Sequence, residues 1–213
     1  MTHSAWGQTV EPPADSAPVD FNARHEICLK AITVDADTAY EDALIWKGDG
    51  GGYRARHCLA MALFAVGHKD EAAYRLENMG AEIRTGTPSM RADWLTESAD
   101  FWLATGDARA AYRASTSALD IVPDHLDARL TRARSYAKLE RWDYAEIDLS
   151  STLMQHPRNV KALRYRADAR RRLGKLSLAT EDIEKALTFD PMSVETALVR
   201  GEIREAIRLA AQE

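Results

Sequence analysis

The sequence predicts an all-α fold, built as a linear array of antiparallel helix pairs. Pro123, Pro157 and Pro191 lie 34 residues apart, and a fixed period of this size is typical of repeat architectures. Small residues at fixed places in each period allow two helices to pack closely. They form two series with the same spacing: Ala99, Ala133 and Ala167, and Ala111, Ala145 and Ala179.

The period divides the clearest part of the chain into the units 92–125, 126–159 and 160–193. We expect two helices in each unit, with the proline ending the second because it cannot donate a backbone hydrogen bond. The turn between the helices falls on Gly106, Glu140 and Gly174, a place where glycine best tolerates a positive φ.

Two weaker units precede these three, at 20–52 and 53–86. Arg84 stands where the closing proline is expected, and the short insertion Thr87–Arg91 restores the register. After Pro191, residues 194–212 predict one more helix with a charged outer face, which would shield the last apolar surface of the array. Residues 1–19 contain Pro12, Pro13 and Pro18 without helical periodicity, and they predict a disordered tail.

The three clear units resemble the tetratricopeptide repeat (TPR), which has a small residue at position 8, alanine at position 20 and proline at position 32. The resemblance implies a right-handed superhelical solenoid that ends in a C-terminal capping helix. It also implies a groove lined by the first helices, which holds an extended or helical segment of another protein. We therefore expect a non-catalytic protein–protein interaction scaffold with no cofactor and no metal.

The family pattern also indicates which side chains line this groove. Basic residues are frequent among them: Arg134, Lys138, Lys161, Arg164, Arg171 and Arg172. Acidic and neutral positions accompany them, at Asp93, Thr96, Asp100, Asp127, Leu130 and Asp168, and further upstream come Arg54 and His57. Met61 and Phe64 could form an apolar part of the same groove.

The segment from Arg158 to Lys175 has eight basic residues and one acidic residue, a local net charge of +7. Residues 1–52 have a net charge of −6. Because arginine suits carboxylates, the pattern favours an acidic peptide segment or a free C-terminus as the partner. A solvated basic face explains the same pattern equally well. The chaperone-binding clamp of the family needs lysine and asparagine where this chain has Leu130 and Arg134, so that clamp is absent.

Two arginines occupy a position that is usually apolar in the family. Arg132 and Arg166 are each accompanied by an aspartate on the second helix of the same unit, Asp148 and Asp182 respectively. An ion pair between the two helices would offset the burial of each guanidinium. The sequence therefore predicts two structural ion pairs rather than two ligand contacts.

Other features limit the function classes. The net charge of −5 argues against general nucleic-acid binding. The sequence contains no run of 18 apolar residues, so it predicts no membrane span. The glycine-rich Asp49–Gly52 lacks the rest of a phosphate-binding loop, and no zinc-type His pair or Gly-x-Ser-x-Gly motif occurs. His57 is interpreted as a surface histidine.

Two alternatives stay open: a cell-envelope factor that binds an anionic glycan or lipid headgroup through the basic patch, and self-association through the end of the array.

Cys28 and Cys58 are 30 residues apart, and this places them on neighbouring first helices. A disulfide between them is possible without being required, because neighbouring helix axes lie about 8–10 Å apart. Such a bond would indicate an oxidising compartment. Ala5-Trp6-Gly7 resembles the end of a signal-peptide cleavage site. We therefore expect a periplasmic or secreted protein if a signal peptide was removed, with a cytoplasmic protein as the alternative.

Overall fold

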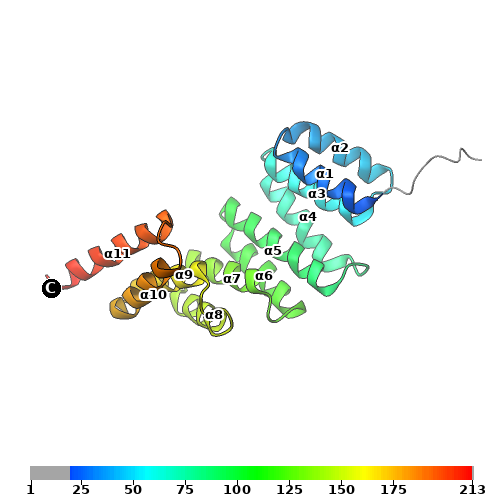
Figure 1. Ribbon diagram of the computed structural model, residues 1–213. Helices are drawn as coiled ribbons and strands as arrows, with labels where there is room; N and C mark the ends of the chain where they lie inside the picture. Colours follow the sequence, from blue (N-terminus) through cyan, green and yellow to red (C-terminus); the bar gives the residue numbers. More distant parts are fainter. Residues whose placement is uncertain (1–19, 213) are drawn as a thin grey trace, which may run out of the picture.

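The computed structural model describes residues 20–212, and within them it contains eleven α-helices and no strand (Figure 1). The helices are α1 (Phe21–Ile32), α2 (Ala36–Gly48), α3 (Gly52–Ala65), α4 (Lys69–Glu82), α5 (Pro88–Thr105), α6 (Ala108–Ile121), α7 (Leu126–Lys138), α8 (Trp142–Gln155), α9 (Val160–Arg172), α10 (Leu176–Phe189) and α11 (Val194–Ala210). The predicted all-α repeat fold is confirmed.

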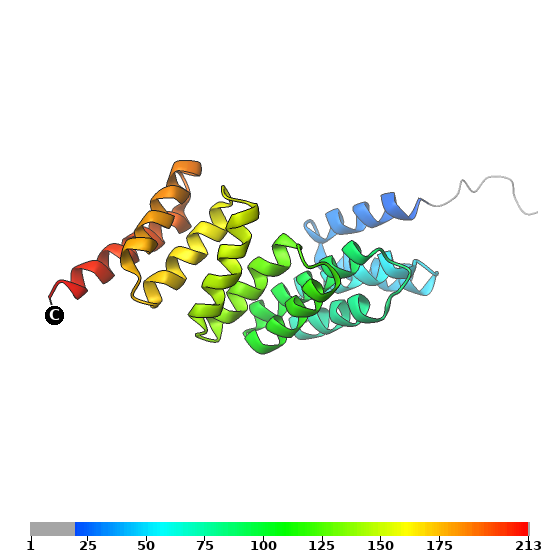
Figure 2. The ribbon, with the colours of Figure 1, turned by 90° about the horizontal axis from the view of Figure 1, so that it is seen from below.

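The helices form an elongated array in which the two ends of the described chain lie at opposite ends (Figure 2). Each odd-numbered helix from α1 to α9 packs against the even-numbered helix that follows it, and each pair packs against the next.

The tail predicted at 1–19 lies outside the described residues. Within the described residues, no helix is both long enough and apolar enough to cross a membrane.

Side chains at the helix starts explain where the helices begin. Asn159 and Ser193 each accept a hydrogen bond from the backbone N–H three residues later, as expected of an N-cap. Thr87 caps α5 in the same way, and Pro88 follows it in the first turn. The inserted segment Thr87–Arg91 therefore forms the cap and the first turn of α5, which is the longest helix described.

The turns inside the units have the predicted left-handed backbone. Gly67, Gly106 and Gly174 have φ values of 97°, 94° and 72°. Glu140 adopts the same conformation, with a φ of 59°, and is the only non-glycine residue described with a positive φ. Because the turn backbone is the same at all four places, each of these units folds back on itself in the same manner.

The predicted interhelical ion pairs are present in the structure. Arg132 Nε and Nη2 each lie 2.7 Å from a carboxylate oxygen of Asp148, and this joins α7 to α8. Arg166 joins α9 to α10 through Asp182 in the same way, at 2.8 and 2.6 Å. Arg170, one turn after Arg166 on α9, contacts both Asp182 and Glu146.

The N-terminal end of the array is tied together by a disulfide. Cys28 on α1 is bonded to Cys58 on α3, with the two Cα atoms 6.3 Å apart. Both cysteines belong to an apolar core that also contains Trp46 and Leu59. The bond therefore connects the first helices of the two units in which the sequence repeat is weakest.

Candidate functional site

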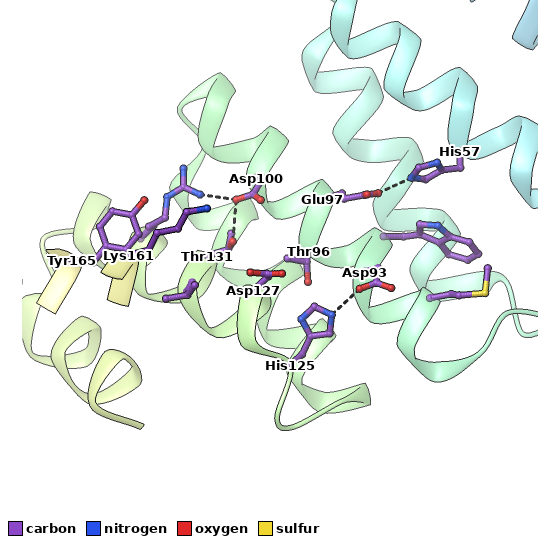
Figure 3. A pocket seen from close by; sticks show the side chains of 14 residues that line it. His57, Asp93, Thr96, Glu97, Asp100, His125, Asp127, Thr131, Lys161 and Tyr165 are labelled. Atoms are coloured by element: carbon purple, nitrogen blue, oxygen red, sulfur yellow. Dashed lines mark hydrogen bonds and ion pairs between the residues drawn. The ribbon is translucent and has the colours of Figure 1, made fainter. Parts of the chain in front are cut away.

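A cavity of about 550 Å³ extends over the first helices of consecutive units (Figure 3). We refer to it as the groove. Its walls come from α3, α5, α7 and α9 and from the residue that precedes α7. The lining residues are His57, Met90, Asp93, Trp94, Thr96, Glu97, Asp100, His125, Asp127, Leu130, Thr131, Arg134, Lys161 and Tyr165.

The charges in the groove are distributed unevenly. One wall carries the four carboxylates Asp93, Glu97, Asp100 and Asp127, contributed by α5 and α7. The lining contains one arginine, Arg134 on α7, and one lysine, Lys161 on α9, and Lys161 lies toward the α9 end (Figure 3). The groove is therefore acidic over most of its length and has a basic end.

Two histidines hold two of these carboxylates in place. His57 Nε2 lies 2.7 Å from Glu97 Oε2, and His125 Nε2 lies 2.9 Å from Asp93 Oδ1. His125 Nδ1 also accepts the backbone N–H of Ala128, where it caps α7. A ring that accepts at Nδ1 must carry its proton on Nε2, so neutral His125 donates to Asp93.

The other two carboxylates differ from each other. Asp100 accepts hydrogen bonds from Arg134 Nη1 at 2.7 Å and from Thr131 Oγ1 at 2.9 Å, and this holds the Arg134 side chain against α5. Asp127 is exposed and has no ion-pair or hydrogen-bond partner among the described side chains. It is therefore the carboxylate of the groove that is most open to a ligand.

A third helix reaches this wall through a pair of histidines. His25 on α1 lies 2.9 Å from His57, measured from Nε2 to Nδ1. Burial lowers the pKa of His25 to about 4, and the neighbouring His57 and Arg54 act in the same direction. The interpretation of His57 as a surface residue is wrong: it is only 7% exposed, because α1 and α5 enclose it on two sides.

The six predicted basic groove residues do not lie together. Arg134 and Lys161 line the groove, whereas Arg164 and Arg171 are directed toward the terminal helix α11. Arg164 lies 3.7 Å from a carboxylate of α11, and Arg171 lies 2.9 Å from another. Their side chains are only 16% and 15% exposed. The high positive charge of this segment is therefore partly neutralised by α11.

The remaining predicted residues lie outside the groove. Lys138 and Arg172 are exposed, and the Arg172 guanidinium lies 5.3 Å from the centre of the Trp142 ring. Met61 and Phe64 pack against the N-terminal core, where Phe64 stacks on the ring of Phe101 with the ring centres 3.7 Å apart. Neither of these apolar residues lines the groove.

Several lining residues were not predicted from the sequence. Glu97, Tyr165 and Trp94 belong to positions that the family pattern does not assign to the groove, and His125 precedes its helix. A helix exposes about a third of its circumference to a groove this wide, so neighbours of the assigned positions reach it. α5 alone carries three acidic residues and one basic residue, and this charge could have indicated the acidic wall.

Comparison with known proteins gives partial sequence relatives and many solved structures. No family model matches the chain. Sperm-associated antigen 1 of Mus musculus is 36% identical over 87 residues, which make up 41% of this chain and 10% of the mouse protein. The matched part is thus a small fraction of that relative.

Two solved structures illustrate the structural similarity. The first TPR of Spaghetti (RPAP3), bound to the HSP90 peptide SRMEEVD, is 27% identical with a TM-score of 0.53 and covers 58% of this chain and 95% of that one. YrrB, described as a TPR protein with an unusual peptide-binding site, reaches a TM-score of 0.65 at 14% identity and covers 86% of this chain and 91% of that one. Their helical-repeat architecture is that of the present chain.

Proposed function

We propose that this chain, a tetratricopeptide-repeat protein, is a non-catalytic interaction scaffold that holds a peptide segment of another protein in the groove. The observation that carries the proposal is the cavity of about 550 Å³ over α3, α5, α7 and α9. Its volume lies within the range of about 300–1,000 Å³ that is typical of ligand sites. A peptide bound there would contact several units at once.

The groove charges support a more specific partner than the sequence suggested. An entirely acidic segment would meet Asp93, Glu97 and Asp127 and would be repelled by them. The peptide SRMEEVD, which the Spaghetti TPR binds, carries two glutamates and one aspartate against a single arginine, so it is mainly acidic. We therefore propose a different peptide class for this groove, in which a lysine or arginine faces the α5–α7 carboxylates.

The basic end of the groove gives this partner a direction. Lys161 is exposed and has no ion-pair partner among the described residues. An acidic side chain or a terminal carboxylate of the peptide would lie near Lys161, while the basic side chain lies near Asp127. The proposed ligand is thus a peptide of mixed charge, and its acidic part corresponds to the carboxylate partner expected from the sequence.

A selection from a random peptide library tests this function. The wild-type protein should enrich peptides that contain lysine or arginine, and an Asp93→Asn, Asp127→Asn variant should lose most of that enrichment. The new amide oxygen at position 93 could still accept the His125 hydrogen bond, so this variant should keep its fold. Asp120→Asn, at an exposed position of α6 outside the groove, is the matched control.

The outcomes separate the proposal from its alternatives. Enriched peptides without basic residues, or peptides that the double variant retains, would contradict the charge assignment while leaving the scaffold function intact. An absence of any selected peptide would contradict the scaffold function itself. Binding of anionic glycans or lipid headgroups would then favour a cell-envelope role, and a mass that rises with concentration would favour self-association.

We also propose that the protein works in an oxidising compartment, the periplasm or the exterior of the cell. Support comes from the Cys28–Cys58 bond, since such bonds persist mainly where thiols are not kept reduced. A cytoplasmic location would predict two free thiols in the native protein. The thiol count described below distinguishes these locations.

A further inference from the structure

A second pocket, of about 310 Å³, lies between α2, α3 and α4. We call it the anion pocket; its lining residues are Lys47, Arg56, Leu59, Arg75, Asn78 and Met79. None of these residues lines the groove. The pocket is therefore separate from the peptide site proposed above, and nothing in that function requires it.

Three cations from three different helices converge on this pocket. Lys47 belongs to α2, Arg56 to α3 and Arg75 to α4, and no carboxylate is among the lining residues. Like charges placed close together repel one another, and this arrangement lowers stability unless an anion compensates it. The pocket thus has a local positive charge within a protein whose net charge is −5.

The pairing of these cations differs from that of other arginines in the chain. Arg132, Arg166 and Arg170 all contact carboxylates at less than 3 Å. By contrast, Arg56 is partly buried, and neither it nor Lys47 has an ion-pair or hydrogen-bond partner among the described residues. Among residues 20–212, Arg75 forms an ion pair only with Glu71, in an exposed pair within α4 that solvent weakens. The donors of the pocket are therefore largely available.

The remaining lining residues limit the ligand. Asn78 adds an amide that can donate two hydrogen bonds, and Leu59 and Met79, each 1% exposed, form an apolar floor. Guanidinium groups match the oxygen spacing of carboxylates and phosphates. We propose that the anion pocket binds a small molecule through a phosphate or carboxylate group, which lies between Arg56, Lys47 and Arg75.

An NMR titration at constant ionic strength tests this site. Inorganic phosphate is added in one arm and succinate in the other, with the backbone amide of Asn78 and the Nε–H of Arg56 as reporters. At least one anion should give a saturable shift confined to α2, α3 and α4. Arg56→Gln should weaken that binding by about tenfold or more, because it removes a charge-assisted hydrogen-bond donor.

Arg113→Gln is the matched control, since Arg113 is an exposed arginine of α6 far from the pocket in sequence and outside its lining. A response to phosphate alone assigns a phosphate ligand, and a response to succinate alone assigns a carboxylate. The proposal is overturned if neither anion gives a saturable shift. It is overturned equally if the Arg56→Gln and Arg113→Gln variants bind the anion as tightly as the wild type does.

Discussion

Arg166 and Asp182 face each other across the two helices of one unit and form a two-point ion pair, with N–O distances of 2.8 and 2.6 Å. Arg170 donates to the same carboxylate at 2.8 Å. Asp182 is 4% exposed, so a single buried carboxylate balances two guanidinium groups. Arg170 in turn contacts Glu146 of the preceding unit, and the cluster thereby joins two repeats.

Removal of this carboxylate should destabilise the array strongly. Asp182→Ala would leave Arg166 without the only carboxylate partner that it has in the described part of the chain, and breaking a buried pair costs about 3–5 kcal/mol. We expect urea denaturation to give a free energy of unfolding lower by about 3 kcal/mol. Glu205→Ala, which breaks an exposed pair with Arg208, is the control and should leave the free energy of unfolding nearly unchanged. Equal losses in both variants would show that Asp182 has no special structural role.

Glycine at position 80 allows α4 and α5 to approach closely. A Cβ there would lie 2.4 Å from Leu95 Cγ and 3.0 Å from the backbone oxygen of Arg91. Gly80→Ala should therefore destabilise the protein by about 1–3 kcal/mol, as overpacking does elsewhere. Thermal unfolding followed by circular dichroism measures the change.

Gly201 is the matched control for this substitution. It lies in the middle of α11, with no atom within 4 Å of an added Cβ. Gly201→Ala should stabilise the helix by roughly 0.5–1 kcal/mol, because alanine loses less backbone entropy than glycine. If both variants shifted the melting temperature in the same direction, the close approach at Gly80 would not be the controlling factor.

The fold and its structural ion pairs could be predicted from the sequence because they depend on residues inside one unit. Arg132 and Asp148 are 16 residues apart, and the repeat period alone places them on facing helices. Arg164 pairs with Glu195, and Arg171 pairs with Glu202 as well as with Asp168 of its own helix. Both glutamates belong to α11, beyond the last repeat. A local count of basic residues could not include those carboxylates, so it overestimated the free charge.

The acidic wall was only partly predicted, for a related reason. Asp93, Asp100 and Asp127 stand at groove positions of the family pattern, but Glu97 does not, and the stacking of α5 against α7 brings the four carboxylates together. His57 shows the same limit: its contacts are His25 and Glu97, at sequence separations of 32 and 40 residues. Such contacts depend on how the units stack, and no pattern within one unit determines them.

The pH dependence of stability should report on His25. Its pKa of about 4 in the folded protein lies below the ordinary value of 6.5, so the unfolded chain binds its proton more readily. The contribution of neutral His25 to the free energy of unfolding is therefore complete above about pH 6.5, and it is lost as the pH falls toward 4. Since His25 is half-buried, solvent screening limits the loss to about 1–2 kcal/mol.

Urea denaturation of the wild type and of His25→Gln between pH 4 and 7 measures this loss. Burial is the main cause of the low pKa, and the nearby His57, Arg54 and Glu97 also act on the ring. The variant should show a flatter dependence on pH in this window. His156→Gln, at an exposed position, is the control and should follow the wild type. A wild-type slope in the His25→Gln variant would assign the pH dependence to other groups.

The Cys28–Cys58 bond makes a prediction about the compartment. Protein that is purified without reductant and then unfolded in guanidinium should show no thiol that reacts with a thiol reagent. Reduction should then release two thiols. Two thiols before reduction would contradict both the bond and the proposed oxidising compartment.

The same bond should also stabilise the N-terminal end of the array. Because the cysteines have a sequence separation of 30, loss of the bond should cost about 3–4 kcal/mol in a chain-entropy model. Because α1 contacts the rest of the array mainly through α2 and α3, the Cys58→Ser variant should lose hydrogen-exchange protection first in α1 and α2. Equal loss along the whole array would indicate instead that all repeats unfold as one cooperative unit.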